Sequence, residues 1–299
     1  MSDAPTAVNA VNAPESTIHD LGYRRYTGAR VSARGAWSAL FAQSLRAMFG
    51  LGRPAKAKVI PVFVVVVTVL PALAMVTASS ASQGAVPLRY GQIIGAQLLL
   101  FVLFLAAQAP EVLSRDQQHR LLPLLFTRDV SRFSYASSRA AAVFTAVFLV
   151  ALAPLMLMYI GEIGIAKDPS ATFAKMGERI GPVLAQSTLS ALAMSGIGTA
   201  LASLTPRRAY ATAAIFGTFL LLAAIATGLD DLAGVSVRTA ELLDPIRALR
   251  TMALELFGET NRGMELNPPP SIGVYVALMV GWSAAGFAAL VWRIRRLRP

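Results

Sequence analysis

Long apolar runs without a charged residue dominate the pattern along the chain. Each run reaches or exceeds the roughly 20 residues that a helix needs to cross the hydrocarbon core of a bilayer. A buried helix of a soluble protein is the alternative for any one run, but six runs in one chain favour a membrane protein. The predicted membrane spans are residues 59–80, 91–110, 138–161, 181–204, 209–228 and 271–292.

The composition agrees with this pattern. Of 299 residues, 55% are hydrophobic and only 14% are charged, whereas an ordinary soluble domain carries about 25% charged residues. The mean hydropathy is +0.57, which is high for a soluble protein. We therefore predict an all-α fold, a polytopic membrane protein with six transmembrane helices in residues 59–299. The first 58 residues lack an early apolar region, so we expect the first span itself to direct insertion.

Lysine and arginine set the expected orientation. With six spans, both termini and the second and fourth connections share one side, and that side holds 19 of the 27 basic residues. By the positive-inside rule, both termini are then cytoplasmic, in a multi-pass protein of the plasma membrane. The net charge of +11 does not indicate nucleic-acid binding, because basic stretches such as residues 293–299 directly adjoin spans, where they interact with anionic headgroups.

The polar N-terminal region has two parts. Residues 1–33 are rich in Ala, Asn, Ser and Thr without a sustained period, which predicts a flexible cytoplasmic tail. Residues 34–58 follow as an amphipathic connecting helix and a basic linker. The large apolar residues on one side of this helix are Trp37, Leu40, Phe41, Leu45, Met48 and Phe49. We expect the helix to lie on the membrane surface, and packing on a partner is the alternative.

The longest outer connection, about residues 230–270, contains a predicted short helix. Asp244 followed by Pro245 is typical of an N-cap and a first helical turn, and Gly258 is well placed to end the helix. The apolar positions between them fall on one face and are Ile246, Leu249, Met252, Ala253, Leu256 and Phe257. Such a face must pack either on the outer ends of the spans or on the bilayer surface.

Catalytic and nucleotide-binding motifs are absent from the sequence. The chain has no H-E-x-x-H or G-x-S-x-G motif, and no span carries a pair of carboxylates for acid and base chemistry. Because no glycine is followed by lysine, a P-loop is impossible, and any ATP and Mg would be bound by another subunit. We therefore expect the chain not to be an enzyme. It has no cysteine, and its two histidines, His19 and His119, lie far apart, so no metal site is expected.

One compact, charged segment interrupts this apolar chain. Residues 111–135, EVLSRDQQHRLLPLLFTRDVSRFSY, connect the second and third spans on the expected cytoplasmic side. The middle of the segment, LLPLLF, is too apolar for a free loop and must be covered. A short helix with both charges and exposed leucines suits docking into a cleft of a cytosolic partner. A helix that rests on the lipid headgroups is the alternative on physical grounds.

The segment resembles the signature of ABC-2 type transporter permeases, in which the second span runs into a pattern similar to S-R-E-R-E-x-G-T-L-E-x-L-L-x-x-T-P-x-S-R. Residues on matching or like positions are Ser114, Arg115, Asp116, Leu122, Leu124, Leu125, Ser131 and Arg132. The chain departs from the pattern at Arg120 and Leu121, in place of Gly-Thr, and at Arg128 and Asp129, in place of Thr-Pro. The order of an amphipathic helix and six spans is also similar, and residues 23–53 resemble an actinobacterial branch of the family.

The resemblance implies a permease subunit whose coupling helix, in residues 114–126, docks on a separate ABC ATPase (nucleotide-binding) subunit. Two permease chains, identical or sister chains, would associate in the lipid bilayer, usually for export. The residues that would couple to the ATPase subunit are Arg115, Asp116, Gln117, Gln118, His119, Arg120, Leu121, Leu122 and Leu125. Of these, Leu121, Leu122 and Leu125 would supply the apolar contacts. A non-transport membrane scaffold or sensor that recruits a cytosolic partner through the same segment is the alternative.

The resemblance also implies that the second and fifth spans border a central pathway. The candidate pathway residues are Gln97, Phe101, Phe104 and Gln108 in the second span and Thr212, Phe216 and Phe219 in the fifth. Their aromatic and amide side chains favour an apolar or amphipathic substrate over a small ion. Plain helix packing, with the glutamines bonded across helices, is the alternative.

Overall fold

The computed structural model describes residues 32–127, 130–166, 169–231, 236–259 and 269–296, and for residues 169–176 and 238 it describes the backbone only. Residues 1–31 of the predicted tail and residues 232–235 and 260–268 of the outer connection lie outside these ranges. The elements are α1 (Ala33–Met48), the short 3₁₀ helix η1 (Ala55–Lys58), α2 (Val59–Ala81), α3 (Tyr90–Gln118), α4 (Leu121–Phe126), α5 (Arg132–Ile165), α6 (Pro169–Leu204), α7 (Arg208–Asp231), α8 (Val237–Glu241), α9 (Pro245–Leu256) and α11 (Ile272–Arg296).

Among the described residues, six helices are long and apolar enough to cross a membrane, which confirms the predicted six-span, all-α fold. They contain α2, α3, α5, α6, α7 and α11. Several of them continue past the apolar runs that predicted them. The α3 helix runs on to Gln118, and α5 already begins at Arg132, where the side chain of Ser131 accepts a hydrogen bond from the backbone N–H of Ser134. The helices therefore extend beyond the uncharged segments and bring charged residues with them.

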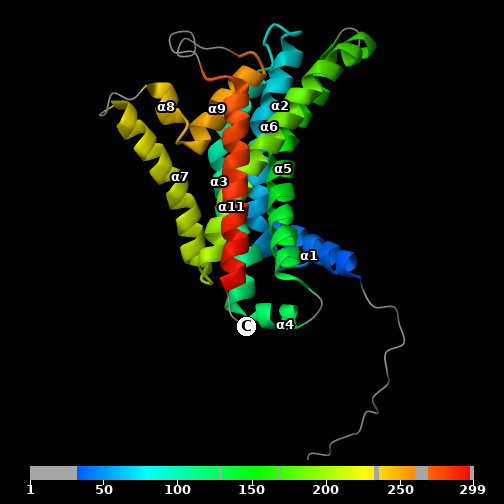
Figure 1. The fold of residues 1–299 in the computed structure, drawn as a ribbon. Helices are drawn as coiled ribbons and strands as arrows, with labels where there is room; N and C mark the ends of the chain where they lie inside the picture. The colour runs from blue at the N-terminus through cyan, green and yellow to red at the C-terminus, as the bar shows by residue number, and fades with distance from the viewer. Residues whose placement is uncertain (1–31, 128–129, 167–168, 232–235, 260–268, 297–299) are drawn as a thin grey trace, which may run out of the picture. The chain divides into compact units, whose positions relative to one another are not determined.

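The spans divide into an inner and an outer group. In the most apolar windows of the inner helices α3, α6 and α5, 67%, 67% and 50% of the residues are buried, against 17% in α7 and 22% in α2 and α11. The α6 helix packs extensively on both α5 and α11, and α3 packs on α9 and α7 (Figure 1). Large apolar side chains of the outer helices, such as Phe63 and Leu221, stay exposed. Apolar surface on this scale requires a lipid environment, so the protein is a multi-pass membrane protein.

A very close helix crossing joins α6 to α11. A β-carbon placed on Gly286 would overlap the backbone of Gly196, and a β-carbon on Gly196 would overlap that of Ser283. Only glycine allows the two backbones to approach this closely, as is common where membrane helices cross. The last span is therefore held directly against the centre of the bundle.

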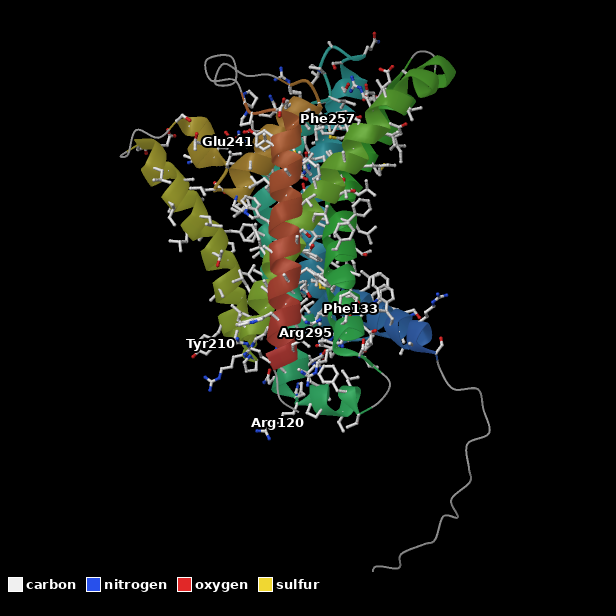
Figure 2. All side chains as sticks on the ribbon, in the orientation of Figure 1. Arg120, Phe133, Tyr210, Glu241, Phe257 and Arg295 are labelled. Atoms are coloured by element: carbon white, nitrogen blue, oxygen red, sulfur yellow. The ribbon has the colours of Figure 1, made fainter. Side chains whose placement is uncertain are left out.

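The two ends of the bundle carry different short helices. Figure 2 shows Arg120, Tyr210 and Arg295 at one end, called here the α4 end, and Glu241 and Phe257 at the other, called the α9 end. The two names imply no orientation in the membrane. The α4 end also carries the last turn of α11 and lies nearer to α1 (Figure 1).

The predicted outer helix is present as α9. The side chain of Asp244 accepts a hydrogen bond from the backbone N–H of Ile246 at 2.9 Å, and Gly258, with φ at +68°, follows the helix as expected. Its apolar face includes Leu249 and Met252, which are fully buried, and α9 packs most extensively on α3. Of the two alternatives, the structure therefore shows packing on the ends of the spans.

The predicted connecting helix is present as α1, and it packs on its own chain. Its buried side chains are Leu40, Ser44 and Met48, and the helix lies against α5 and α3. The chain then turns at Gly50, where φ is +67° and a β-carbon would lie 2.7 Å from the carbonyl oxygen of Ala57. Glycine at this position lets the linker fold back closely before α2 begins. The helix, the linker and the end of α3 consequently lie together.

Candidate functional site

The charged segment 111–135 forms two helices and a turn. The α3 helix continues to Gln118, the chain reverses at Arg120, where φ is +50°, and α4 begins at Leu121. The predicted coupling segment 114–126 is thus not a single helix. A left-handed conformation is unusual for arginine because its β-carbon crowds the backbone, and glycine is the residue that takes it most readily. This is the position at which the permease pattern has glycine.

The leucines of α4 face different ways. Leu122 is only 7% exposed and packs into the core, and Leu125 packs partly against the same core. Leu124 is 66% exposed and Leu121 is 39% exposed. Sequence reasoning assigned the apolar contacts with a partner to Leu121, Leu122 and Leu125. Leu124, which was outside that set, is the most exposed leucine of the helix, and Leu122 instead anchors the helix to its own chain.

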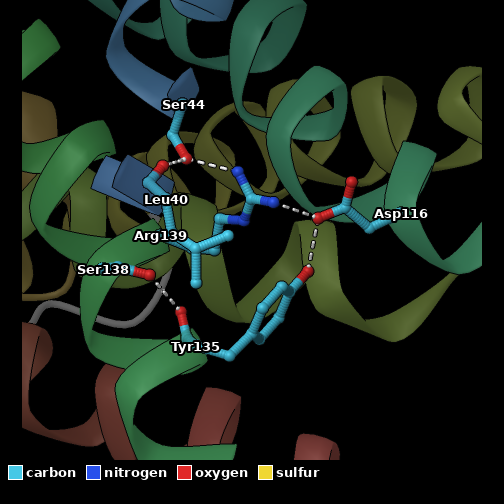
Figure 3. A network of polar contacts seen from close by, with 6 residues as sticks. All are labelled: Leu40, Ser44, Asp116, Tyr135, Ser138 and Arg139. Carbon is cyan, nitrogen blue, oxygen red and sulfur yellow. Dashed lines mark hydrogen bonds and ion pairs between the residues drawn. The ribbon is translucent and has the colours of Figure 1, made fainter. Parts of the chain in front are cut away.

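A buried polar network lies where α3 ends and α5 begins (Figure 3). Arg139 forms an ion pair with Asp116, with 2.6 Å between Nη2 and Oδ2, and the hydroxyl of Tyr135 donates to the same oxygen at 2.8 Å. Arg139 also donates to Ser44 Oγ of α1, whose own hydroxyl donates to the Leu40 carbonyl at 2.5 Å. These residues are called the Asp116 network below, and they join α1, α3 and α5.

The environment of Asp116 identifies it as an internal residue. The Asp116 and Arg139 side chains are 13% and 5% exposed, so little of either charge reaches water. A buried ion pair of this kind is sustained by its partners, and removal of one partner leaves an uncompensated charge. Arg139 was not among the predicted site residues. Its place just before an uncharged run gave no sign that it would meet a carboxylate on another helix.

A second charged group lies on another side of the α3 end. Glu111 forms an ion pair with Arg53 of the linker, with 2.6 Å between Nη2 and Oε2, and another with Arg208 at the start of α7. Arg115, one helical turn farther along α3, lies 3.8 Å away. Glu111 and its three arginines are called the Glu111 cluster below. One carboxylate thus holds the linker, α3 and α7 together and is outnumbered by cations.

The other predicted coupling residues occupy the remaining faces of this end. The Gln117 amide donates to the Ser203 carbonyl at 3.0 Å, and the Ser114 hydroxyl donates to the Ala202 carbonyl at 2.9 Å, so α3 is fastened to α6. Side chains that face solvent are Arg115, Gln118, His119 and Arg120. The structure therefore gathers the predicted coupling residues at one end, but divides them between internal contacts and exposed surface.

The predicted pathway residues of the second span lie inside the fold of this chain. Gln97, Phe101, Phe104 and Gln108 are all buried. The Gln97 amide donates to the Thr68 carbonyl of α2 at 2.6 Å, as the packing alternative expects. In the fifth span, the Thr212 hydroxyl donates to the Ala106 carbonyl of α3 at 2.8 Å, Phe219 is buried and Phe216 is half-buried. In a single chain, these residues join α3 to its neighbours, and a role beside a pathway stays a prediction.

Comparison with known proteins does not assign a family. No family model matches the chain, and no curated protein is significantly similar to it. In the part of the chain that the structure describes, no three His, Asp or Glu side chains gather closely enough to hold a metal ion.

Proposed function

We propose that this chain is the transmembrane permease subunit of an ATP-binding cassette transporter, and that α4 is the element on which a separate ATPase subunit docks. The observation that carries the proposal is the division of the α4 leucines. Leu122 fixes the helix to the bundle, while Leu124 presents apolar surface outward and Leu121 is exposed at the edge of a cavity beside α1. A rigid apolar pair surrounded by exposed charge is typical of an anchor for a protein interface.

The position of α4 favours docking over rest on lipid headgroups. Figure 1 shows α4 beyond the end of α11, whereas α1 lies level with the last turns of the long helices. A headgroup-resting helix would be expected at the level of α1, where an amphipathic face meets the boundary of the apolar belt. An element farther out needs another cover for Leu121 and Leu124, and a soluble subunit supplies one.

The contacts of α4 suit the transmission of movement. Phe126 lies edge-on to Tyr135 of α5, with ring centroids 6.0 Å apart, and the Arg132 guanidinium lies 5.5 Å from the centre of the Phe126 ring. Arg132 also donates to the Arg295 carbonyl of α11 at 2.6 Å. Displacement of α4 would therefore act on α5 and α11 together, and on α3 through the turn at Arg120.

Energy and a complete pathway would come from partner subunits. The chain carries no P-loop, so ATP and Mg would bind to the ATPase subunit, and the chain itself would not be an enzyme. Two permease chains, identical or sister chains, would form the pathway in the plasma membrane, with both termini and the α4 end cytoplasmic. The proposed direction of transport is export, and the proposed substrate is an apolar or amphipathic molecule.

The decisive experiment separates the exposed leucines from the anchoring one. In the double variant Leu121→Ala/Leu124→Ala, the fold should survive, and co-purification of a P-loop ATPase from native membranes should fall roughly 10- to 100-fold. The matched control is Leu220→Ala/Leu221→Ala, which removes two exposed leucines from α7 and should keep the ATPase. Leu122→Ala should instead lower thermal stability, by about 2–5 kcal/mol for a buried leucine.

The result also distinguishes the two function classes. A partner without ATPase activity that is lost in the same double variant would support the non-transport scaffold or sensor. An ATPase that stays bound in the double variant would contradict docking through α4. The assay is mass spectrometry of the purified complex together with ATP hydrolysis in the same preparation.

Orientation has its own test, because the chain contains no cysteine. Gln118→Cys at the α4 end and Ala85→Cys at the α9 end both place a thiol on an exposed position. We expect a membrane-impermeant thiol reagent to label residue 85 in intact cells and residue 118 only after the membrane is opened. Labelling in the reverse order would overturn the proposed topology.

A further inference from the structure

Two adjoining cavities lie beside the linker and the end of α3, the larger one against α1, α4 and α5 and the smaller one against α7. The larger has a volume of about 880 Å³ and the smaller about 370 Å³. Arg53, Glu111, Arg115 and His119 line both of them. Both volumes fall in the range of small-ligand pockets, about 300–1,000 Å³. The larger cavity is called the α1 pocket.

The charges that line the α1 pocket are unbalanced. They comprise four arginines and two carboxylates, which are Arg46, Arg53, Arg115, Arg139, Glu111 and Asp116. Asp116 is matched by Arg139, but Glu111 faces Arg53, Arg115 and Arg208 together. Arg46 has no ion pair with any described residue and is exposed. The pocket therefore has a surplus of positive charge, which favours an anionic ligand.

A buried arginine adds to the positive charge of the wall. Arg139 lines the pocket and is 4% exposed. Its terminal nitrogens already bind Asp116 and Ser44. Arg139 therefore contributes positive charge beside a ligand, while the more exposed arginines of the pocket are free to bind it directly.

The rim of the pocket lies where the chain enters the apolar belt. Leu51, which lines the pocket, is 55% exposed, and the exposed lysines Lys56 and Lys58 follow it. Directly after them, α2 begins with Val59, which is 62% exposed. Basic residues next to exposed apolar ones are typical of the headgroup region of a bilayer. A phosphate at this level is most readily supplied by a lipid.

We propose that the α1 pocket binds the phosphate headgroup of an anionic phospholipid, with Arg46, Arg53 and Arg139 as the cationic side chains around it. The acyl chains would leave past Leu51 and lie along the first turns of α2. Arg46 is the arginine that can bind the phosphate without giving up an ion pair. The lipid would join α1, the linker and α3, and this holds whether or not the chain serves a transporter.

The test measures retention of a defined lipid by the purified protein. Delipidated protein in a neutral detergent is titrated with dioleoyl phosphatidylglycerol, and bound lipid is counted by native mass spectrometry. The natural chain should retain one phosphatidylglycerol tightly. This lipid should bind about fivefold more weakly to Arg46→Gln, and still more weakly to Arg46→Glu. Arg34→Gln and Arg34→Glu are matched controls, because Arg34 is exposed on the same helix and outside the pocket lining, and they should bind like the natural chain.

Further measurements distinguish a lipid headgroup from a free anion and from a protein partner. Phosphatidylcholine should be retained weakly, and inorganic phosphate at the same concentration should not displace phosphatidylglycerol. Displacement by phosphate alone would overturn the lipid assignment in favour of a free anion. Equal loss in the Arg34 and Arg46 variants would contradict a defined pocket. Unchanged lipid binding in Arg46→Glu, together with loss of a co-purifying protein, would assign the pocket to a protein partner instead.

Discussion

The Asp116 network and the Glu111 cluster lie near each other on α3 but hold their charges in opposite ways. Asp116 meets one arginine and one tyrosine, and all three side chains are buried. Glu111 meets three arginines, and the side chains of Arg115 and Arg208 are about half exposed. In the first group the charges are balanced and shielded from water. In the second, the side chains of Glu111 and Arg53 are only 9% and 18% exposed, but Arg115 and Arg208 reach water, so solvent screens part of the surplus of positive charge.

The two groups also serve different parts of the fold. The Asp116 network joins α1 to the inner helices α3 and α5, whereas the Glu111 cluster joins the linker and α7, which is among the least buried spans. Strong contacts thus fix the inner helices, and weaker, salt-sensitive contacts hold the outer ones. A rearrangement of this end would break the ion pairs of Arg115 and Arg208 first, because these two arginines have solvent as a substitute partner.

The largest expected effect comes from Arg139→Ala. This change leaves Asp116 buried without its cation, so we expect a loss of about 3–5 kcal/mol in stability, measured by thermal unfolding in detergent. Arg115→Ala removes the same charge from the Glu111 cluster and should cost far less. The double variant Asp116→Leu/Arg139→Met should recover much of the loss, because no lone charge then remains buried. A double variant as unstable as Arg139→Ala would show that packing, and not charge, dominates the network.

The next effect concerns Glu111→Gln. Removal of this carboxylate leaves three arginines close together, and we expect a loss of about 1–3 kcal/mol at low salt, less than for Arg139→Ala because two of the arginines are half exposed. The loss should shrink towards 1 M salt, where the Debye length falls to about 3 Å. Glu162→Gln, which removes the partner of Arg179 at the α9 end, provides a control with a single cation. If the loss caused by Glu111→Gln were the same at every salt concentration, the cluster would behave like a buried pair and the comparison would fail.

A gain is expected from Arg120→Gly. Arg120 has a left-handed backbone, which costs conformational energy. Its side chain is exposed and has no charge partner among the described residues. Glycine relieves that cost, and we expect stability to rise by up to about 1 kcal/mol, reduced by the greater freedom of glycine in the unfolded chain. Arg120→Ala keeps the β-carbon and should change little. A clear loss in both Arg120→Gly and Arg120→Ala would mean that the arginine side chain contributes to the turn as Arg139 does to its network.

The smallest effect tests a carboxylate at the α9 end. Burial raises the pKa of Asp244, against the lowering effect of the backbone amides of Ile246 and Arg247 and of the Arg247 charge. Because the folded-state pKa lies above the unfolded value, Asp244 favours folding when protonated, and this contribution is lost as the pH rises through the folded-state pKa. Asp244→Asn keeps a capping oxygen without the charge. It should therefore equal or slightly exceed the natural chain in thermal stability at neutral pH.

The same variant has a definite pH dependence. The difference between Asp244→Asn and the natural chain should vanish below about pH 4, where aspartate is protonated even in the unfolded chain. Thermal unfolding across the acidic range would measure it. A natural chain that was more stable than Asp244→Asn at neutral pH would contradict the raised pKa.

Local signals predicted the parts of this structure that depend on local physics. The six spans follow from apolar length, and α9 follows from Asp244, Pro245 and Gly258, because caps act within one turn. The ends of α3 and α5 were less accessible, since a helix continues through charged residues when other helices supply their partners. The pairing of Asp116 with Arg139 was out of reach for the same reason.

The roles of the α4 residues were harder to predict from the sequence than the fold. Leucines crowd four of the six positions of a short helix, so spacing alone could not tell which of them faces the core. The outcome depends on the turn at Arg120, which fixes the rotation of α4, and arginine gives no signal of a left-handed backbone. Sequence reasoning consequently indicated the segment but could not assign the roles of Leu122 and Leu124.

The cap of α3 has a consequence for how the protein is made. Glu259 accepts hydrogen bonds from the backbone N–H groups of Gly91 and Gln92, the first of which lies 168 residues earlier in the chain. At synthesis rates of about 5–20 residues per second, roughly ten to thirty seconds separate the emergence of α3 from that of its cap. During this interval the first turn of the central span has exposed amides and no carboxylate. The nascent protein must therefore hold α3 in place by other means until Glu259 has been synthesised.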